Sequence, residues 1–346
     1  MIDKAVASGI LPDKIIRGGI QHFIKKRIKE DIGLTVSQRE VKRLSFIENM
    51  RRSPVAVETD LANDQHYCLP PEFFELVLGK NLKYSCCHWG NSKSLDEAEN
   101  EMLDLTISRA QITDGMKILE LGCGWGSITL SMAKKYPNSK ILAVSNSPMQ
   151  REFILNKAKQ LGLSNVSVET HNVAELNLDQ RFDRVVSVEM FEHMRNYPEL
   201  LKRISSWLNP NGKLFVHIFV HRDVPYLYEV KDDSDWMSKY FFSGGIMPSA
   251  HIFHYFTDHM NVENYWAVDG IHYQKTARAW LDNMDQKKSQ IFKVLKKHYG
   301  EKDYKKWFHY WRIFFMSCEE LWKYDNGSEW FVGHYLLNKS GEVSVE

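Results

Sequence analysis

From about residue 100 onward, short apolar runs alternate with stretches in which apolar residues recur at helical spacing. The apolar runs have the length and β-branched content of buried strands, and they are MKILELG, SKILAVSN, NVSVETHNV, FDRVVSVEM and GKLFVHIFV. The stretches between them predict helices, and they are SITLSMAKKY, REFILNKAKQLG and ELLKRISSWL. Strands that alternate with helices of about 10 to 15 residues predict a mostly parallel sheet covered on both faces. We therefore expect a doubly wound α/β fold.

The chain on either side of this core has a different pattern. Residues 1 to about 60 predict helices, and a second helical region follows the turn at Pro70-Pro71. Eight of the ten tryptophans lie from Trp207 onward, together with the glycine-bearing loops FFSGGIMPS and YDNGSEW. We predict an N-terminal helical cap over residues 1–100, a core over 101–225, and an acceptor-binding, aromatic-rich insertion over 226–346 that also supplies the last strands of the sheet.

One predicted helix near the N-terminus is basic. Between Lys14 and Lys29 there are six Lys or Arg residues and no acid. Apolar residues recur there at helical spacing: Ile15, Ile16, Ile20, Phe23, Ile24 and Ile28. The segment is interpreted either as a membrane-surface helix or as the solvated face of a helix that packs on the protein. The acids Glu30 and Asp31 follow at once and favour packing. A lysine-rich stretch over 287–306 is likewise interpreted as a solvated helix face.

Composition narrows the class of protein. The net charge of +1 over 346 residues gives no global field for nucleic acid or an anionic surface, and 43% hydrophobic content can form a sizeable core. No apolar run approaches the roughly 20 residues that cross a bilayer, and residues 1–16 lack a signal-peptide pattern. The five cysteines have no CxxC spacing, so we predict neither a disulfide framework nor a metal site. These features indicate a reduced, cytoplasmic protein without stable membrane insertion.

A glycine loop follows the first predicted strand, in the stretch ILELGCGWGSITL. Its glycines form G-x-G-x-G and not the dinucleotide fingerprint G-x-G-x-x-G: Gly122, Gly124 and Gly126. Glu120 lies inside the strand, and no lysine follows to hold phosphates. Bare backbone beside a carboxylate suits a cofactor with an amino acid end, whose ammonium needs an acceptor. The loop resembles the first signature of S-adenosylmethionine-dependent methyltransferases; the alternative is a turn that only packs strand on helix.

Two amides stand where such enzymes usually carry an acid that binds ribose hydroxyls. The second strand ends in SNSPMQ, which offers Asn146 and Gln150. Amide groups can bond a diol, although with less assistance from charge.

Two acids and a histidine follow the fourth predicted strand, in VEMFEHMRN. Glu189, Glu192 and His193 would lose hydration at the end of a buried strand unless something binds them. One alternative is a capped helix start with ion pairs to Arg195 or Arg203. A cap accounts for one acid, but it accounts poorly for two acids and a histidine, so we predict a catalytic cluster.

Nearly the whole chain from about residue 50 to Lys339 resembles the cyclopropane fatty acid synthase family, and within it the plant coclaurine N-methyltransferase branch. The shared landmarks appear in order: QHYCLPPEFF, LKYSCCHW, LDEAE, LELGCGWGS, SNSPMQ, VEMFEHM, FFSGGIMPS, YWRIFF and NGSEWF. The resemblance implies a Rossmann-like class I methyltransferase fold. It implies S-adenosylmethionine as methyl donor and S-adenosylhomocysteine as product.

The resemblance also implies which residues form the two binding sites. Those expected to contact the cofactor, with the loop glycines, are Tyr67, Ser85, Gly122, Gly124, Gly126, Asn146, Gln150, Asn172, Val173 and Val188. Those expected to line the acceptor pocket are Glu189, Glu192, His193, Phe219, Tyr273, Trp311 and Phe314.

The family contains two chemistries, and the sequence carries signs of both. Lipid synthases hold a bicarbonate that removes a proton after alkene methylation, and its ligands correspond here to Cys86, Glu192, His217 and Tyr273. The lipid alternative therefore stays open. The amine enzymes read E-x-F-E-H where lipid synthases carry a small residue first, and this chain has Glu189 at that position. An extra carboxylate suits a cationic amine and has no role beside an alkene.

We therefore expect an N-methyltransferase of small hydrophobic amines, of the benzylisoquinoline, tetrahydroisoquinoline or phenylalkylamine type. Glu189 and Glu192 would attract the substrate ammonium, and Glu192 or His193 would take its proton. An ordinary histidine pKa near ~6.5 would let His193 accept a proton at neutral pH. The expected partner is the small-molecule amine and no nucleic acid, with a homodimer left open.

Overall fold

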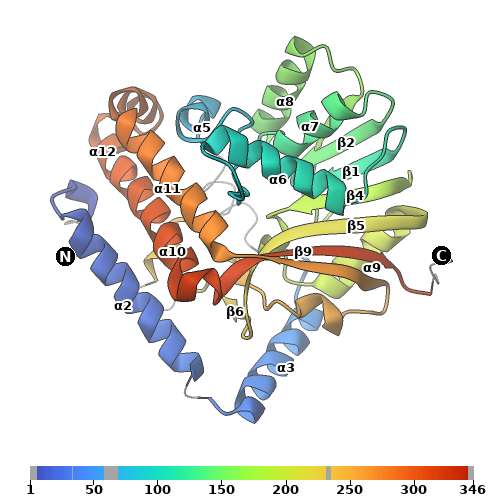
Figure 1. The fold of residues 1–346 in the computed structure, drawn as a ribbon, viewed down its shortest axis with the longest axis horizontal. Coiled ribbons are helices and arrows are strands. Elements are labelled where there is room, and N and C mark those ends of the chain that lie inside the picture. Colours follow the sequence, from blue (N-terminus) through green and yellow to red (C-terminus); the bar gives the residue numbers. More distant parts are fainter. Residues whose placement is uncertain (1–5, 33, 58–68, 231–234, 342–346) are drawn as a thin grey trace.

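The computed structural model describes residues 6–32, 34–57, 69–230 and 235–341. A seven-stranded sheet in the order β3-β2-β1-β4-β5-β9-β8 forms its centre (Figure 1). The strands are β1 (Lys117–Leu121), β2 (Lys140–Ser145), β3 (Val166–Thr170), β4 (Phe182–Val188), β5 (Leu208–His221), β8 (Met260–Val268) and β9 (Trp330–Lys339). Strands β1 to β5 pair in parallel, and β9 runs antiparallel to both β5 and β8. The five predicted strands and the mostly parallel, doubly wound fold are thus confirmed.

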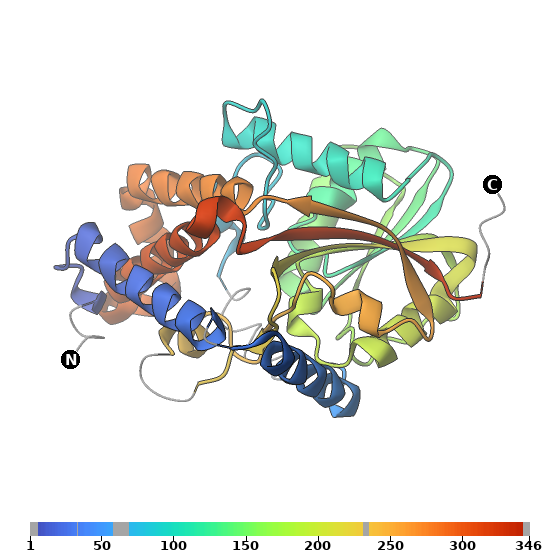
Figure 2. The same cartoon turned by 60° about the horizontal axis from the view of Figure 1, so that its bottom comes forward.

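Helices cover both faces of the sheet, as Figure 2 shows for the segments around residues 50 and 100. The helices of this part are α3 (Val36–Arg52), α6 (Leu95–Arg109), α7 (Ser127–Lys135), α8 (Pro148–Gln160) and α9 (Tyr197–Trp207). Side chains of α6 and α7 share one buried cluster with Ile118, whereas side chains of α3 and α9 share another with Leu119. Successive residues of β1 point to opposite faces, so both faces of the sheet are buried.

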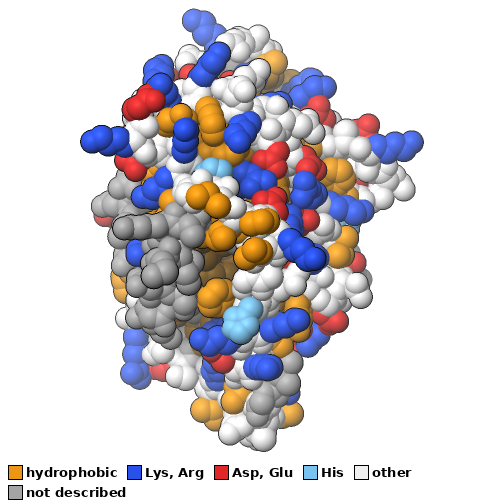
Figure 3. All heavy atoms as spheres, turned by 90° about the vertical axis from the view of Figure 1, so that its left-hand side faces the viewer, with side chains coloured by type: hydrophobic (Ala, Val, Ile, Leu, Met, Phe, Trp, Pro, Cys, Tyr) orange, Lys and Arg blue, Asp and Glu red, His pale blue; other side chains and the backbone are white. Residues whose placement is uncertain are grey.

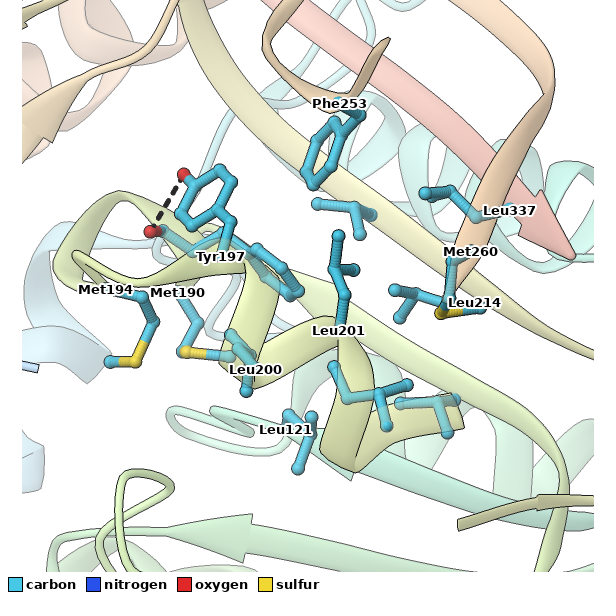
Figure 4. Close-up of a cluster of buried hydrophobic side chains, with 14 of the residues drawn as sticks. Leu121, Met190, Met194, Tyr197, Leu200, Leu201, Leu214, Phe253, Met260 and Leu337 are labelled. Carbon is cyan, nitrogen blue, oxygen red and sulfur yellow. Dashed lines mark hydrogen bonds between the residues drawn. The ribbon is translucent and has the colours of Figure 1, made fainter. Parts of the chain in front are cut away.

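The face toward α9 carries the larger of these clusters (Figure 4). Tyr197 lies in it fully buried, and its hydroxyl donates to the carbonyl oxygen of Phe191 at 3.0 Å. This bond satisfies the phenol in an apolar setting. It also ties the start of α9 to the short 3₁₀ turn η1 (Phe191–His193), which contains two of the predicted catalytic residues.

A second helical layer lies beside the sheet and forms its own core. Its helices are α2 (Asp13–Ile32), α5 (Pro71–Val77), α10 (Trp236–Tyr240), α11 (Gly270–Gln286) and α12 (Lys288–Trp322). Small elements complete the chain: β6 (Tyr226–Leu227), β7 (Ile246–Met247), η2 (Ile252–Tyr255) and η3 (Tyr324–Gly327). Gly300 interrupts α12 with φ 78°. The predicted boundaries at 100 and 225 stay a prediction, although α2 and α5 pack with α11 and α12, so cap and insertion share one core.

The basic N-terminal helix packs on the protein. In α2, Arg17 pairs with Glu319 and Glu320 of α12 at 2.6 Å, and Ile24 and Ile28 are buried. These contacts favour the packing interpretation. Figure 3 shows acidic and basic side chains interspersed with hydrophobic ones over this side of the molecule. None of the helices in the described part of the chain combines the length and apolar character of a membrane span.

Candidate active site

The glycine loop after β1 borders a cavity at the carboxyl ends of β1, β2 and β4, and Gly122 and Gly124 line it. All three glycines of the loop have positive φ: Gly122 (79°), Gly124 (51°) and Gly126 (83°). A Cβ on Gly122 would lie 2.7 Å from the Met190 side chain, so the loop needs glycine there for both conformation and space. The loop ends at the first turn of α7, which leaves bare backbone facing the cavity.

The cavity and its mouth enclose about 1060 Å³, including space open to solvent. The predicted cofactor residues that line it are Ser85, Gly122, Gly124, Asn146, Gln150, Asn172, Val173 and Val188. Residues from strands far apart in the sequence therefore meet at the switch point of the sheet. Tyr67 lies outside the described residues. Gly126 does not line the cavity; it lies at the start of α7, with Ile154 where its Cβ would be.

Two polar side chains in the cavity wall, Gln150 and Glu120, could each bind a group of S-adenosylmethionine. Among the described residues, Gln150 Nε2 has no hydrogen-bond partner, while its Oε1 accepts from Ser145 Oγ at 2.6 Å. Burial raises the pKa of Glu120 to about 8. The hydrogen bond that the Thr129 hydroxyl donates to this carboxyl group has the opposite, smaller effect on the pKa. The buried amide of Gln150 can donate to a ribose hydroxyl, and the buried carboxyl group of Glu120 can bind an ammonium.

Glu189 is the centre of the hydrogen bonds beside this cavity. Its Oε1 accepts from the Cys86 backbone N–H at 2.9 Å and lies 3.1 Å from His217 Nε2. Its Oε2 accepts from the Tyr273 hydroxyl at 2.6 Å. Burial raises the pKa of Glu189, while the charge of Lys83 and the donors at Cys86 and Tyr273 lower it.

The same contacts change the interpretation of the predicted bicarbonate ligands. Cys86, His217 and Tyr273 all lie within hydrogen-bond distance of the Glu189 carboxyl group, so in this structure the three groups already contact a side chain of the protein itself. Glu192, the fourth group, is 1% exposed, and its Oε2 has no partner among the described residues. Burial, and then the charge of Glu189, raise the pKa of Glu192 well above its usual range.

His193 lines the cavity, and its ring lies 5.0 Å from that of Phe242. Burial lowers the pKa of His193 to about 4, with the Glu189 charge acting in the opposite direction. The expectation of an ordinary histidine pKa is therefore wrong, because an imidazolium here would lose its hydration. His193 is neutral at pH 7, but it is a weaker base than its sequence position suggests.

The predicted acceptor-pocket aromatics separate into two groups. Tyr273 stacks on Trp322 at 4.7 Å, and Phe219 lies 5.7 Å from Trp322, so these rings border the Glu189 cluster. Trp311 instead lies fully buried in the helical core, 5.0 Å from Phe73. Phe314 stacks on Phe241 in the same core at 4.6 Å. None of these four aromatic residues lines the cavity itself. Trp311 lies inside the helical layer, and Phe314 packs against it half-buried.

Several site residues had no distinguishing mark in the sequence. Trp322 was one of eight tryptophans assigned to the C-terminal region. Lys83 is 1% exposed, and its Nζ donates to Ser85 Oγ and, at 2.7 Å, to the Cys86 carbonyl. A lysine is rarely buried without a partner, but the burial of Lys83 depends on segments distant in the chain, so nothing in the sequence marks it.

The chain matches the family model described as mycolic acid cyclopropane synthetase over residues 57–326. It is 37% identical to (S)-coclaurine N-methyltransferase of Thalictrum flavum subsp. glaucum, over 97% of this chain and 94% of that protein. The chain belongs to the mycolic acid cyclopropane synthetase family. The crystal structure of coclaurine N-methyltransferase bound to N-methylheliamine and S-adenosylhomocysteine superposes with a TM-score of 0.95 at 36% identity, covering 98% of this chain and 99% of that one.

The lipid branch of the family is more distant. The cyclopropane-fatty-acyl-phospholipid synthase of Escherichia coli (strain K12) is 26% identical over 78% of this chain and 65% of that protein. The comparisons thus confirm the predicted family, the Rossmann-like methyltransferase fold and the methyltransferase activity of the chain. They also bear out S-adenosylmethionine as the methyl donor used in this family.

Proposed function

We propose that the protein transfers a methyl group from S-adenosylmethionine to the nitrogen of a small hydrophobic amine of the benzylisoquinoline, tetrahydroisoquinoline or phenylalkylamine type. The similarity to (S)-coclaurine N-methyltransferase over nearly the full length supports an amine acceptor. We further propose that the protein is cytoplasmic. Its partner would be this small molecule and no nucleic acid, because a net charge of +1 gives no electrostatic basis for binding nucleic acid.

The observation that carries the proposal is the position of the Glu189 carboxylate. It accepts from Cys86, His217 and Tyr273, so a bicarbonate cannot use the same three donors while Glu189 remains in place. An ionised Glu189 beside the cavity would attract an ammonium and a sulfonium, both of which are cations. An alkene carries no charge for it to bind.

The cofactor supplies an electrophilic methyl group on a sulfonium. The residues of this chain would hold it in the cavity: Glu120 near the ammonium, Gln150 and Asn146 near the ribose, and the bare backbone of the glycine loop between them. Positioning the nitrogen at about 3 to 3.5 Å in line with the methyl group supplies much of the rate.

The acceptor must lose a proton before its nitrogen can attack, and Glu192 is suited to take it. An ammonium that enters the pocket favours the ionised form of Glu192. A carboxylate shielded from water is then a stronger base than an exposed one. His193, with a pKa of about 4, would orient the amine and contribute less as a base. The aromatic rings of Phe219, Tyr273 and Trp322 would stabilise the cation, each by roughly 0.5 to 2 kcal/mol.

Cofactor binding is expected to release close to one proton per site at pH 7. Glu120 has a pKa of about 8 and is therefore mostly protonated in the free protein, whereas the cofactor ammonium would favour its ionised form. Titration calorimetry of S-adenosylhomocysteine in phosphate and in Tris measures the protons from the difference in binding enthalpy. Glu120→Gln should remove the difference, and equal enthalpies for the wild-type protein in both buffers would refute the pairing.

The acceptor class can be tested in one reaction. Purified protein is incubated with methyl-labelled S-adenosylmethionine, a mixture of tetrahydroisoquinolines and phenylalkylamines, and unsaturated phospholipid vesicles. Mass spectrometry then locates the label, which we expect on an amine nitrogen. Label in acyl chains would overturn the proposal and favour the cyclopropane synthase alternative, whose bicarbonate ligands remain in the sequence. A parallel reaction without bicarbonate distinguishes the two, because only the lipid reaction needs that anion.

A further inference from the structure

A line of buried hydrogen bonds connects Glu189 to the far side of the sheet. His217 Nε2 lies 3.1 Å from Glu189 Oε1, and His217 Nδ1 lies 2.9 Å from His334 Nε2. His334 Nδ1 in turn lies 2.8 Å from Nη1 of Arg109, the last residue of α6. His217 on β5 and His334 on β9 are direct partners in the antiparallel ladder, so the strand register brings the two rings together.

The direction of every bond in this line follows from its outer end. An arginine guanidinium stays protonated and has no acceptor, so Arg109 must donate to His334 Nδ1. The ring proton of His334 therefore sits on Nε2 and is donated to His217 Nδ1. The ring proton of His217 then sits on its own Nε2, where it faces the Glu189 carboxylate.

The surroundings keep both imidazole rings neutral, so that each ring carries a single N–H proton. Both histidines are fully buried. Burial lowers the pKa of His217 well below its usual range, and the nearby charges of Lys83 and Arg109 lower it further. Burial is also the main cause that lowers the pKa of His334 well below its usual range, and the nearby His217, Arg109 and Lys83 lower it further.

Arg109 is held in place from the other side as well. Its guanidinium carbon lies 5.1 Å from the centre of the Trp266 ring on β8. A cation stacked on an indole face is restricted in orientation. The outer end of the line therefore rests on the last strand of the sheet, away from both predicted binding pockets.

We propose that Arg109 and His334 are positioning residues that fix the tautomer of His217, so that His217 presents an N–H to Glu189 and holds its carboxylate ionised and oriented. In the opposite tautomer, a ring lone pair would face the carboxylate oxygen at 3.1 Å. Glu189 would then have to rotate away or take up a proton, and the acceptor pocket would lose its anion. The inference rests on the proposed amine function for its consequence, but not for the bonding itself.

The tautomers can be measured directly by NMR on the full-length protein labelled with ¹⁵N-histidine, because the two ring nitrogens have different shifts when protonated or not. We expect both His217 and His334 in the neutral Nε2–H form from pH 6 to 8. The His334→Phe variant keeps a ring but lacks both nitrogens, so the ¹⁵N signals that disappear in its spectrum belong to His334. A wild-type spectrum with Nδ1–H or doubly protonated rings would overturn the inference.

Variants at Arg109 connect the tautomer to turnover. Arg109→Met removes the donor and should leave His217 and His334 as a mixture of tautomers, while Arg109→Lys keeps a positive donor and should restore the single form. In Arg109→Met, kcat/KM for the amine should fall about tenfold to 100-fold, mainly through KM, with KM for S-adenosylmethionine unchanged. A single wild-type tautomer in Arg109→Met would refute the role of Arg109.

The two proposals fail separately. The NMR measurement needs no acceptor, so a wrong tautomer overturns this inference and leaves the amine function untouched. Conversely, label that appears only in acyl chains overturns the amine function while the bonding from Arg109 to Glu189 still stands. Melting temperatures of the Arg109 and His334 variants distinguish the loss of these hydrogen bonds from a general loss of folding.

Discussion

Glu189→Gly is expected to lower kcat/KM for the amine by about 100-fold or more, equivalent to about 3 kcal/mol, because it removes a buried anion from beside the acceptor. The substitution also exposes three donors, at Cys86, His217 and Tyr273, that are left without an acceptor. Added bicarbonate or formate should fill this space and restore part of the turnover. Initial rates with increasing anion at constant ionic strength measure the restoration.

Two matched variants separate the contributions of Glu189. Glu189→Gln fills the same space without charge and should lose activity without responding to added anions. The backbone of Glu189 has φ 48°, which costs a residue with a Cβ about 1 kcal/mol or more but costs glycine little. Glu189→Gly should therefore unfold at a higher temperature than Glu189→Ala. Wild-type amine turnover by Glu189→Gly without added anion would contradict the role given to this carboxylate.

Glu192→Gln is expected to lower kcat by about 10² to 10⁴, the usual contribution of a positioned base. The change preserves shape, so the affinity for S-adenosylhomocysteine should remain that of the wild-type protein. Without the base, only amine that arrives deprotonated can react, so the residual rate should rise tenfold per pH unit below the pKa of the acceptor. Pre-steady-state rates from pH 7 to 9 test this slope.

The control for this prediction is Glu152→Gln, on the exposed face of α8. It makes the same substitution outside the site and should leave both kcat and the pH profile unchanged. A wild-type kcat for Glu192→Gln would show that another group takes the proton.

The core of the fold could be predicted because its signal is local. Apolar runs of strand length and the glycine loop lie within a few residues of one another, and the alternation itself limits the topology. The cluster Glu189, Glu192 and His193 was visible for the same reason, since three ionisable groups directly follow a buried strand. Their pKa values were not visible, because burial by β5 and the helical layer shifts them.

The rest of the site depends on pairings between distant segments. His217 and His334 are 117 residues apart and meet only because β5 and β9 pair in one particular register. Trp311 and Trp322 looked equivalent, and they lie on nearly the same face of α12, about three turns apart. Trp311 nevertheless packs on Phe73, whereas Trp322 stacks on Tyr273. Sequence spacing cannot distinguish such positions without knowing what packs against the helix.

The place of β9 between β5 and β8 also sets an order on how the site is assembled during folding. The strands that frame the glycine loop are all complete by Val188, whereas His334 joins the sheet only with one of the most distant pairings in the chain. Contacts of such long range form late, because the closure entropy of the intervening loop must be overcome first. A folding intermediate with its first four strands in place would thus have the cleft but not yet the fixed charge of Glu189. We therefore expect the strands around the glycine loop to be in place before the acceptor side of the site is complete.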